Sequence, residues 1–285
     1  MDRNTGGERS ICLEAVDIAR DSTYILNRCV PVSKALEDDR KMLVFPTFRE
    51  RPELLDRWLA ERDPWAGMEW MYHDPICELY WPRLDDDFPD FQFLVYDESE
   101  DAVVGEGRTV PFRWSGREGE LPDGIDGLFP LACDGGEEPN TLSALLAVVA
   151  PNARTKGASV EILKHMASVA RAHELGALVA PVRPTYKSCY PLTPIERYAS
   201  WRRSDGLLFD TWLRTHERLG ARCAGICHNS NVYKGTVAQW TKWTKLEFME
   251  SGHYLAPGMM NPFQVNLETD EGTYREPNVW MIHDV

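Results

Sequence analysis

Apolar and polar residues first alternate with the two-residue period of a β-strand at residues 11–16. A helical period follows at residues 52–62, where a proline opens the segment and three leucines and a tryptophan share one face. Residues 91–97 and 102–112 are rich in β-branched and aromatic side chains and are separated by a short acidic turn. This last pair predicts a β-hairpin.

The middle of the chain holds a nearly continuous apolar run at residues 142–150, which is typical of a strand covered on both faces. Apolar residues then recur at helical spacing over residues 160–170, and Gly176 stands where a left-handed residue would end the helix. A second short apolar run follows at residues 178–182. A strand, a helix and a strand in this order predict a right-handed crossover between parallel strands.

A segment rich in proline and arginine, residues 183–205, follows this unit and is longer than a plain connection needs. We therefore interpret it as a candidate functional insertion. The remaining predicted elements are loops at 116–127 and 133–140, a helix at 211–219, a helix opened by a capping box of Thr236 and Gln239, and strands at 263–267 and 279–283.

Composition narrows the class of protein. The chain has 285 residues, 43% of them apolar, and contains no apolar run near the roughly 18 residues of a membrane span, so a globular protein without a membrane partner is expected. A net charge of -14 argues against nucleic acid as the main partner. Seven scattered cysteines and a polar N-terminus favour reduced thiols and a cytoplasmic location. No ligand spacing suggests a metal site, so none is expected.

The turn after the central apolar run combines three features of an anion site. Arg154 and Lys156 supply positive charge, and Gly157 removes the side chain that would block a close approach. The helix that follows directs backbone N–H groups and a partial positive charge to the same point. These features predict a phosphate or diphosphate site.

This turn resembles the acyl-CoA-binding motif of the Gcn5-related N-acetyltransferase (GNAT) superfamily, Arg/Gln-x-x-Gly-x-Gly/Ala before a helix. The six matching positions are Arg154, Thr155, Lys156, Gly157, Ala158 and Ser159, with serine in place of the final glycine or alanine. Residues 178–181 resemble the strand that splays from its neighbour around the thioester. Residues 216–221 resemble the terminal Tyr-x-x-x-Gly-Phe signature, with His216 in the tyrosine position and Ala221 in that of phenylalanine.

The resemblance implies an α/β fold in which helices flank a mixed, mostly antiparallel sheet. We expect one elaborated domain over 1–285, with a core at about 91–228 and extensions at about 1–90 and 229–285. The resemblance further implies direct transfer of an acyl group, acetyl above all, from CoA to the amino group of a small molecule. The alternatives are a non-catalytic acyl-CoA-binding or regulatory protein, and an enzyme that acylates a protein or a carrier-bound amine. A homo-oligomer is compatible with either class.

The resemblance also implies roles for individual residues. Arg154, Lys156 and the amides around Gly157 to Ser159 would hold the diphosphate of acetyl-CoA, and the backbone of Leu146, Val148 and Val149 would pair with pantetheine. His216 would protonate the departing thiolate, since an imidazolium of pKa ~6.5 is a sufficient acid.

The general base and the acceptor site are less constrained by the motif. The run at 142–150 contains no carboxylate, so the base must come from elsewhere. Glu196 is the candidate we place in the site, and Glu276 and Asp126 are also available. In the insertion, aromatic and basic side chains are candidates for binding the acceptor amine: Tyr186, Tyr190, Arg197 and Trp201.

Overall fold

The computed structural model describes residues 43–60, 66–150 and 157–285. The strand predicted at residues 11–16 and the turn residues Arg154, Thr155 and Lys156 lie outside these ranges.

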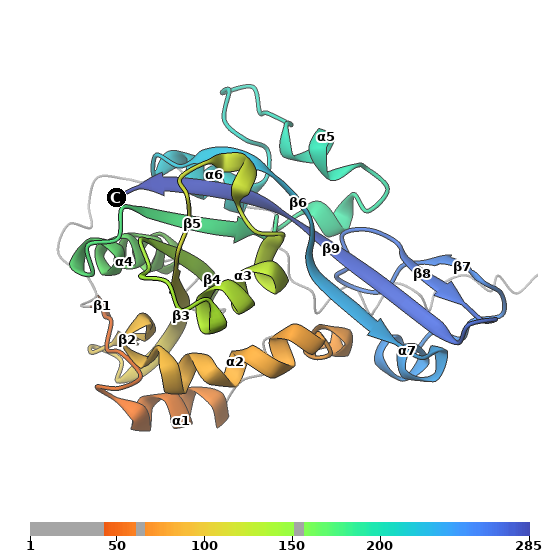
Figure 1. Ribbon diagram of the computed structural model, residues 1–285, viewed down its shortest axis with the longest axis horizontal. Coiled ribbons are helices and arrows are strands. Elements are labelled where there is room, and N and C mark those ends of the chain that lie inside the picture. Colours follow the sequence, from red (N-terminus) through yellow and green to blue (C-terminus); the bar gives the residue numbers. More distant parts are fainter. Residues whose placement is uncertain (1–42, 61–65, 151–156) are drawn as a thin grey trace, which may run out of the picture. The chain divides into compact units, whose positions relative to one another are not determined.

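Nine described strands form one sheet in the order β1-β2-β3-β4-β5-β9-β8-β7, with β6 paired to β9 (Figure 1). Among them only β4 and β5 are parallel, and every other pairing is antiparallel. The predicted mixed, mostly antiparallel sheet is confirmed. Its strands are β1 (Leu43–Val44), β2 (Gln92–Asp97), β3 (Ala102–Phe112), β4 (Thr141–Val149), β5 (Ala177–Val182), β6 (Arg222–Gly235), β7 (Gly252–Tyr254), β8 (Phe263–Asn266) and β9 (Glu271–Asp284).

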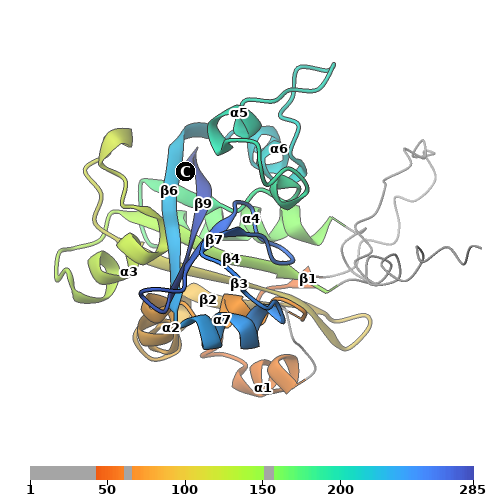
Figure 2. The same cartoon turned by 90° about the vertical axis from the view of Figure 1, so that its right-hand side faces the viewer.

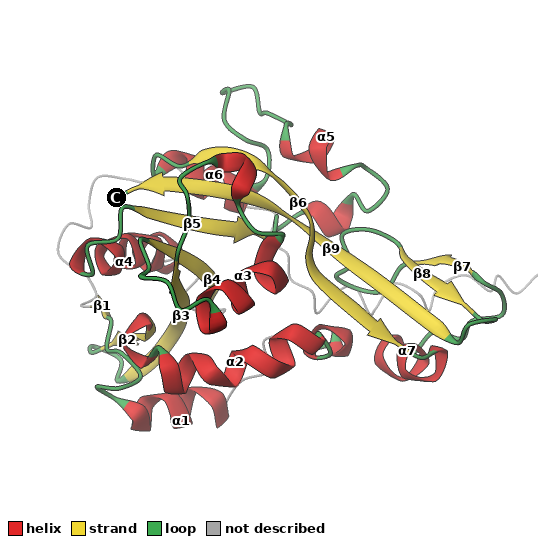
Figure 3. Cartoon of the chain, viewed as in Figure 1, coloured by secondary structure: helices red, strands yellow, loops and turns green. Residues whose placement is uncertain are grey.

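Helices cover both faces of this sheet (Figure 3). On one face, α2 and α3 bury Leu84, Leu128 and Phe129 in a core cluster with alternate residues of β9. On the other face, α4 and α6 pack in a second cluster. The described α-helices are α1 (Pro52–Ala60), α2 (Pro75–Asp87), α3 (Gly124–Asp134), α4 (Ala158–Ala172), α5 (Ile195–Ala199), α6 (Thr211–Arg218) and α7 (Val237–Thr244), with short 3-10 turns at Glu69–Tyr72, Pro89–Phe91, Glu118–Glu120 and Lys187–Cys189.

The crossover predicted in the middle of the chain is present, since α4 joins the parallel strands β4 and β5. Ile162, Leu163 and Met166 are buried on one face of α4, as their spacing requires. The predicted role of Gly176 is wrong. The helix ends at Ala172, and Glu174 (φ 57°) takes the left-handed conformation instead.

The stretch 116–127 is only partly a loop, contrary to our prediction. Helix α3 begins at Gly124 because the following residues, Leu128 and Phe129, form an apolar face that packs into the core despite the glycines before them. Of the loop predicted at 133–140, residues 133 and 134 still belong to this helix, and the rest follows it.

Residues after 228 take part in the central sheet. The boundary at 228 falls inside β6, and β9 pairs with β5 along Val182 to Ala177 and with β6 along most of its length. Figure 2 shows β6 and β9 running side by side as a long ribbon. The last strand of the chain is therefore a neighbour of the crossover unit.

The far end of this ribbon has its own aromatic core. Trp240 of α7 is fully buried there and stacks on Phe263 at a centroid distance of 4.5 Å. A Cβ atom at Gly272 of β9 would lie 2.1 Å from Cδ1 of Trp240, so the strand can approach the indole only where it carries no side chain.

We expect Gly272→Ala to lower the free energy of unfolding by about 1–3 kcal/mol, because the added methyl group must displace a packed indole. Gly119→Ala is the matched control, since a Cβ atom there meets nothing within 4 Å. Urea unfolding midpoints measure both. Equal midpoints for the two variants would contradict the packing described.

Candidate active site

Strands β4 and β5 pair at only two positions, Leu142 with Leu178 and Ser143 with Val179. Beyond these positions the two strands diverge, and a cavity of about 560 Å³ lies between them. Residues 144–147 of β4 and 180–182 of β5 line it. The splayed pair that the resemblance implied is therefore present.

The cavity reaches both faces of the sheet. On the α4 and α6 face, its walls include Leu163, Trp212 and His216. On the opposite face they include side chains of α1, α2 and α3 and of strands β3, β6 and β9. We call this cavity, whose lining comes from both faces of the sheet, the passage.

Ion pairs lie in the wall on the α2 and α3 face. Arg108 of β3 is buried and pairs with Asp85 and, at 3.9 Å, with Glu106. Arg183 donates to Glu276 of β9 over 2.8 Å. Three lining carboxylates (Glu78, Glu106 and Glu276) face two lining guanidinium groups (Arg108 and Arg183). The excess of negative charge favours a cationic ligand on this face.

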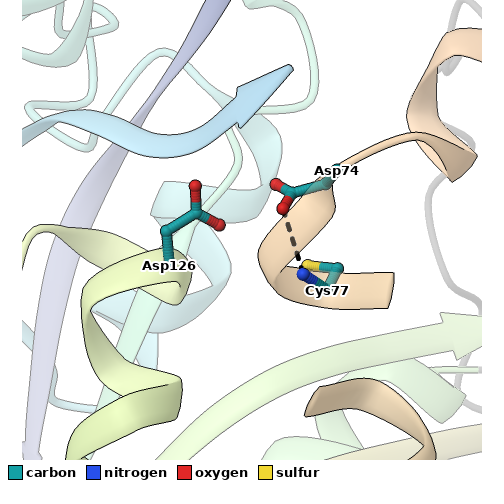
Figure 4. Close-up of side chains that lie close together, drawn as sticks. All are labelled: Asp74, Cys77 and Asp126. Carbon is teal, nitrogen blue, oxygen red and sulfur yellow. Dashed lines mark hydrogen bonds between the residues drawn. The ribbon is translucent and has the colours of Figure 1, made fainter. Parts of the chain in front are cut away.

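A second acidic group lies where α2 and α3 meet (Figure 4). Asp74 and Cys77 at the start of α2 point toward Asp126 of α3, and their potential ligand atoms lie within 4.8 Å of one another. Burial and the nearby Asp74 carboxylate raise the pKa of Asp126 to about 8. Asn231 bridges the pair by donating to both carboxylates, at 3.0 and 3.3 Å.

This group is suited to sharing one proton. All four carboxylate oxygen atoms of Asp74 and Asp126 accept an N–H donor, from Asn231 Nδ2 or from backbone amides. Two carboxylates this close cannot both ionise cheaply, so one of them holds a proton near neutral pH. Among the described residues, Asp74, Cys77 and Asp126 form the group that could hold a metal ion.

His216 is buried in the wall of the cavity, and its Nδ1 lies 2.9 Å from Nε2 of His283. Burial and the neighbouring His283 lower the pKa of His216 to about 3. The ring is therefore neutral near pH 7, which corrects the imidazolium form that its ordinary pKa predicted. Burial also lowers the pKa of His283, while a hydrogen bond to the Leu219 carbonyl opposes this effect.

The two facing ring nitrogens share one proton. Of His216 Nδ1 and His283 Nε2, one donates and the other accepts, depending on the tautomer of each ring.

The predicted CoA-binding residues are distributed along β4 and α4. Leu146 lines the cavity, whereas Val149 packs in the core, and Val148 does not belong to the cavity wall. Gly157 (φ 78°) is the N-cap residue of α4 and has the left-handed conformation, which glycine adopts without strain. Ala158 and Ser159 follow in its first turn.

The other predicted residues lie away from the cavity wall. Glu196 is exposed on α5, with its carboxylate 3.4 Å from His228 Nε2. Arg197 is its exposed neighbour, and Tyr186 bonds through its N–H to Asp210. Tyr190 and Trp201 pack edge to face at 5.0 Å, inside a cluster with Tyr198 and Phe209. Apolar packing thus holds the insertion against the α4 face, opposite the acidic wall.

Sequence reasoning did not single out Arg183, Asn231 or Asn278, which line the cavity. One signal was available for the last of these. Glu276 and Asn278 directly precede the apolar run at residues 279–282 and are two residues apart, so they lie on one face of the terminal strand. Polar residues at that period inside a buried strand indicate a site.

Comparison with known proteins agrees with this geometry. The chain is 27% identical over 271 residues to the arginine N-acetyltransferase avaD of Aspergillus versicolor, which covers 84% of this chain and 93% of that protein. Its fold matches the loading GNATL domain of CurA from Lyngbya majuscula with a TM-score of 0.50, at 16% identity over 85% of this chain and 96% of that domain. No family model matches the sequence.

The divergent central strands, the crossover helix and these likenesses define one class of protein. The chain has the fold of the Gcn5-related N-acetyltransferases and is an acetyltransferase of that type. Among the helices described, none has the length and apolar character to span a membrane.

The raised pKa of Asp126 has a consequence for stability. The pKa is about 8 in the folded protein and ~3.9 in an unfolded chain. Because the folded value is higher, the contribution to stability is complete below about pH 4 and is lost as the pH rises toward 8. Asp126→Asn mimics the protonated side chain. Between pH 6 and 9 the wild-type protein should lose about 1–3 kcal/mol more unfolding free energy than this variant.

Asp86→Asn, on the exposed side of α2, is the control and should follow the wild type. Urea unfolding at pH 6 and at pH 9 provides the comparison. If Asp126→Asn loses as much stability over this interval as the wild type, the shared proton is not there.

Proposed function

We propose that this acyltransferase moves an acetyl group from CoA to the amino group of a small molecule, by direct attack within a ternary complex. The observation that carries the proposal is the passage between β4 and β5, which is lined from both faces of the sheet. The thioester enters between the strands, and the amine arrives from the acidic wall on the α2 and α3 face. The transferase name of the 27% identical relative supports the same reaction and makes arginine the first acceptor to test.

In this reaction the lone pair of a neutral amine attacks the thioester carbonyl carbon. The carbon–nitrogen bond forms, the carbon–sulfur bond breaks, and the sulfur leaves as a thiolate that takes up a proton. The nitrogen loses one proton as the amide forms. We assign the reception of that proton to Glu276, directly or through water, because it is a buried carboxylate in the wall of the cavity.

Binding of CoA is assigned to the end of β4 and the start of α4. Gly157 and the first turn of the helix direct amide groups toward one point, and Arg154 and Lys156 precede them in the sequence. Leu146 in the cavity wall is the β4 residue placed to contact pantetheine.

The second candidate is a protein that binds acyl-CoA without turnover. The absence of a carboxylate from the β4 segment favours it, because many relatives use one there as the base. The two functions differ in one product, since only the enzyme releases free CoA thiol.

The decisive assay follows thiol release from acetyl-CoA with arginine, lysine, agmatine and phenylethylamine as acceptors. We expect release to depend on an amine and an acetylated amine to form in equal amount. Binding of acetyl-CoA without thiol release for any amine would support the non-catalytic alternative.

A substitution that closes the passage tests where the reaction occurs. Ala147 lines the cavity from β4, so Ala147→Trp should lower kcat/KM at least a hundredfold by filling the space that the thioester needs. Ala172→Trp, on the exposed end of α4, is the matched control and should keep wild-type activity. Full activity in Ala147→Trp would place the reaction elsewhere.

His216 as proton donor is tested by the pH profile of kcat. Because the pKa of His216 is about 3, this side chain stays neutral between pH 5 and 9. We therefore expect the pH profile of kcat over this range to have the same shape in the wild type and in His216→Phe. A limb near pH 6.5 that disappears in His216→Phe would instead establish an imidazolium donor.

A further inference from the structure

Asn278 of β9 is anchored through its amide nitrogen. Nδ2 donates to the Pro181 carbonyl over 3.0 Å and to Ser230 Oγ over 2.8 Å. A carbonyl oxygen can only accept, so the first bond fixes which end of the amide faces β5. The orientation of Oδ1, on the other side of the amide, is thereby determined.

The oxygen of this amide lacks a partner. Asn278 is 2% exposed and lines the cavity, and no donor of the described residues reaches its Oδ1. A buried acceptor left unbonded destabilises the protein, and native structures rarely keep one without a reason. A ligand with an N–H group would satisfy it.

The position of Asn278 relates it to the reaction. Its anchor, Pro181, lies on β5 beyond Val179, the last residue that pairs with β4. The side chain is therefore tied to the strand where the passage opens. Glu276 lies two residues earlier on the same face of β9, so the two side chains share the acidic wall.

We propose that Asn278 Oδ1 accepts a hydrogen bond from the nitrogen of the acceptor amine and so directs the lone pair of that nitrogen at the thioester. The assignment rests on the proposed function and specifies its acceptor. During attack the nitrogen becomes positively charged, which strengthens an N–H···O bond. The bond therefore favours the transition state as well as the bound amine.

The same bond selects a class of acceptor. The product of a primary amine keeps one N–H, so its bond to Oδ1 survives while the other proton leaves. A secondary amine loses its last N–H as the amide forms, and the oxygen is left unbonded again. The site therefore selects primary amines over their N-methyl derivatives.

The test compares Asn278→Ala with the wild type, using the most active primary amine of the acceptor panel and its N-methyl derivative. The variant should lose about 10- to 100-fold in kcat/KM for the primary amine, while the KM for acetyl-CoA changes less than twofold. The ratio between the two amines should fall toward one.

Ser230→Ala is the matched control, because it removes one anchor of Nδ2 and leaves Oδ1 in place. If Asn278 only supports the fold, both alanine variants will lose the same activity in proportion to their melting temperatures, and the proposal is overturned. A rise confined to the KM for acetyl-CoA, an unchanged kcat/KM or an unchanged amine ratio also overturns it. If the wild type is active and any of these results is found, only the role of Asn278 is overturned and the proposed function stands. If the wild type is inactive on all amines, both the role of Asn278 and the proposed function are overturned.

Discussion

The structure depends on strands β4 and β5 remaining apart after two paired positions. A gap in the middle of a sheet exposes backbone groups that would otherwise bond each other, so each strand must be held from its outer side. Strand β3 holds β4 along Thr141 to Val149, and β9 holds β5 along its whole length. The helix between them packs its apolar face over both. The opening is thus held in place by the packing on both of its sides.

The charged side chains around this opening are paired or hydrogen-bonded, so they can be buried. Each guanidinium group of the acidic wall has a carboxylate partner, and the Asp74 and Asp126 pair shares its charge through a proton and Asn231. Paired and hydrogen-bonded charges tolerate low dielectric surroundings that isolated ones do not. The remaining excess of carboxylates attracts a cationic amine but also opposes its deprotonation. A neutral attacking amine therefore needs an orienting acceptor and a base close by.

Periodicity in the sequence predicted the hairpin, the crossover helix and the two central strands, because each buries a face whose spacing is local. It did not predict the start of α3, where packing overrides two glycines, or the position of β9, whose pairing with β5 joins residues a hundred apart. The residues of the site also divide into those that a local pattern predicts and those that only long-range pairing brings together. Gly157 and Leu146 could be read from a contiguous motif, whereas Arg183 and Asn278 become neighbours of the cavity only through long-range pairing. His216 was found by its position, but its protonation depends on His283, which no local pattern reveals.

The most direct test of this account is a crystal structure of the protein with acetyl-CoA. In that structure the pantetheine arm should lie between β4 and β5, with the acetyl carbonyl beside residues 144–147 and facing the wall that holds Glu276 and Asn278. The diphosphate should lie at the start of α4, near Gly157. Acetyl-CoA bound outside the cavity, with β4 and β5 closed on each other or the passage empty, would contradict it.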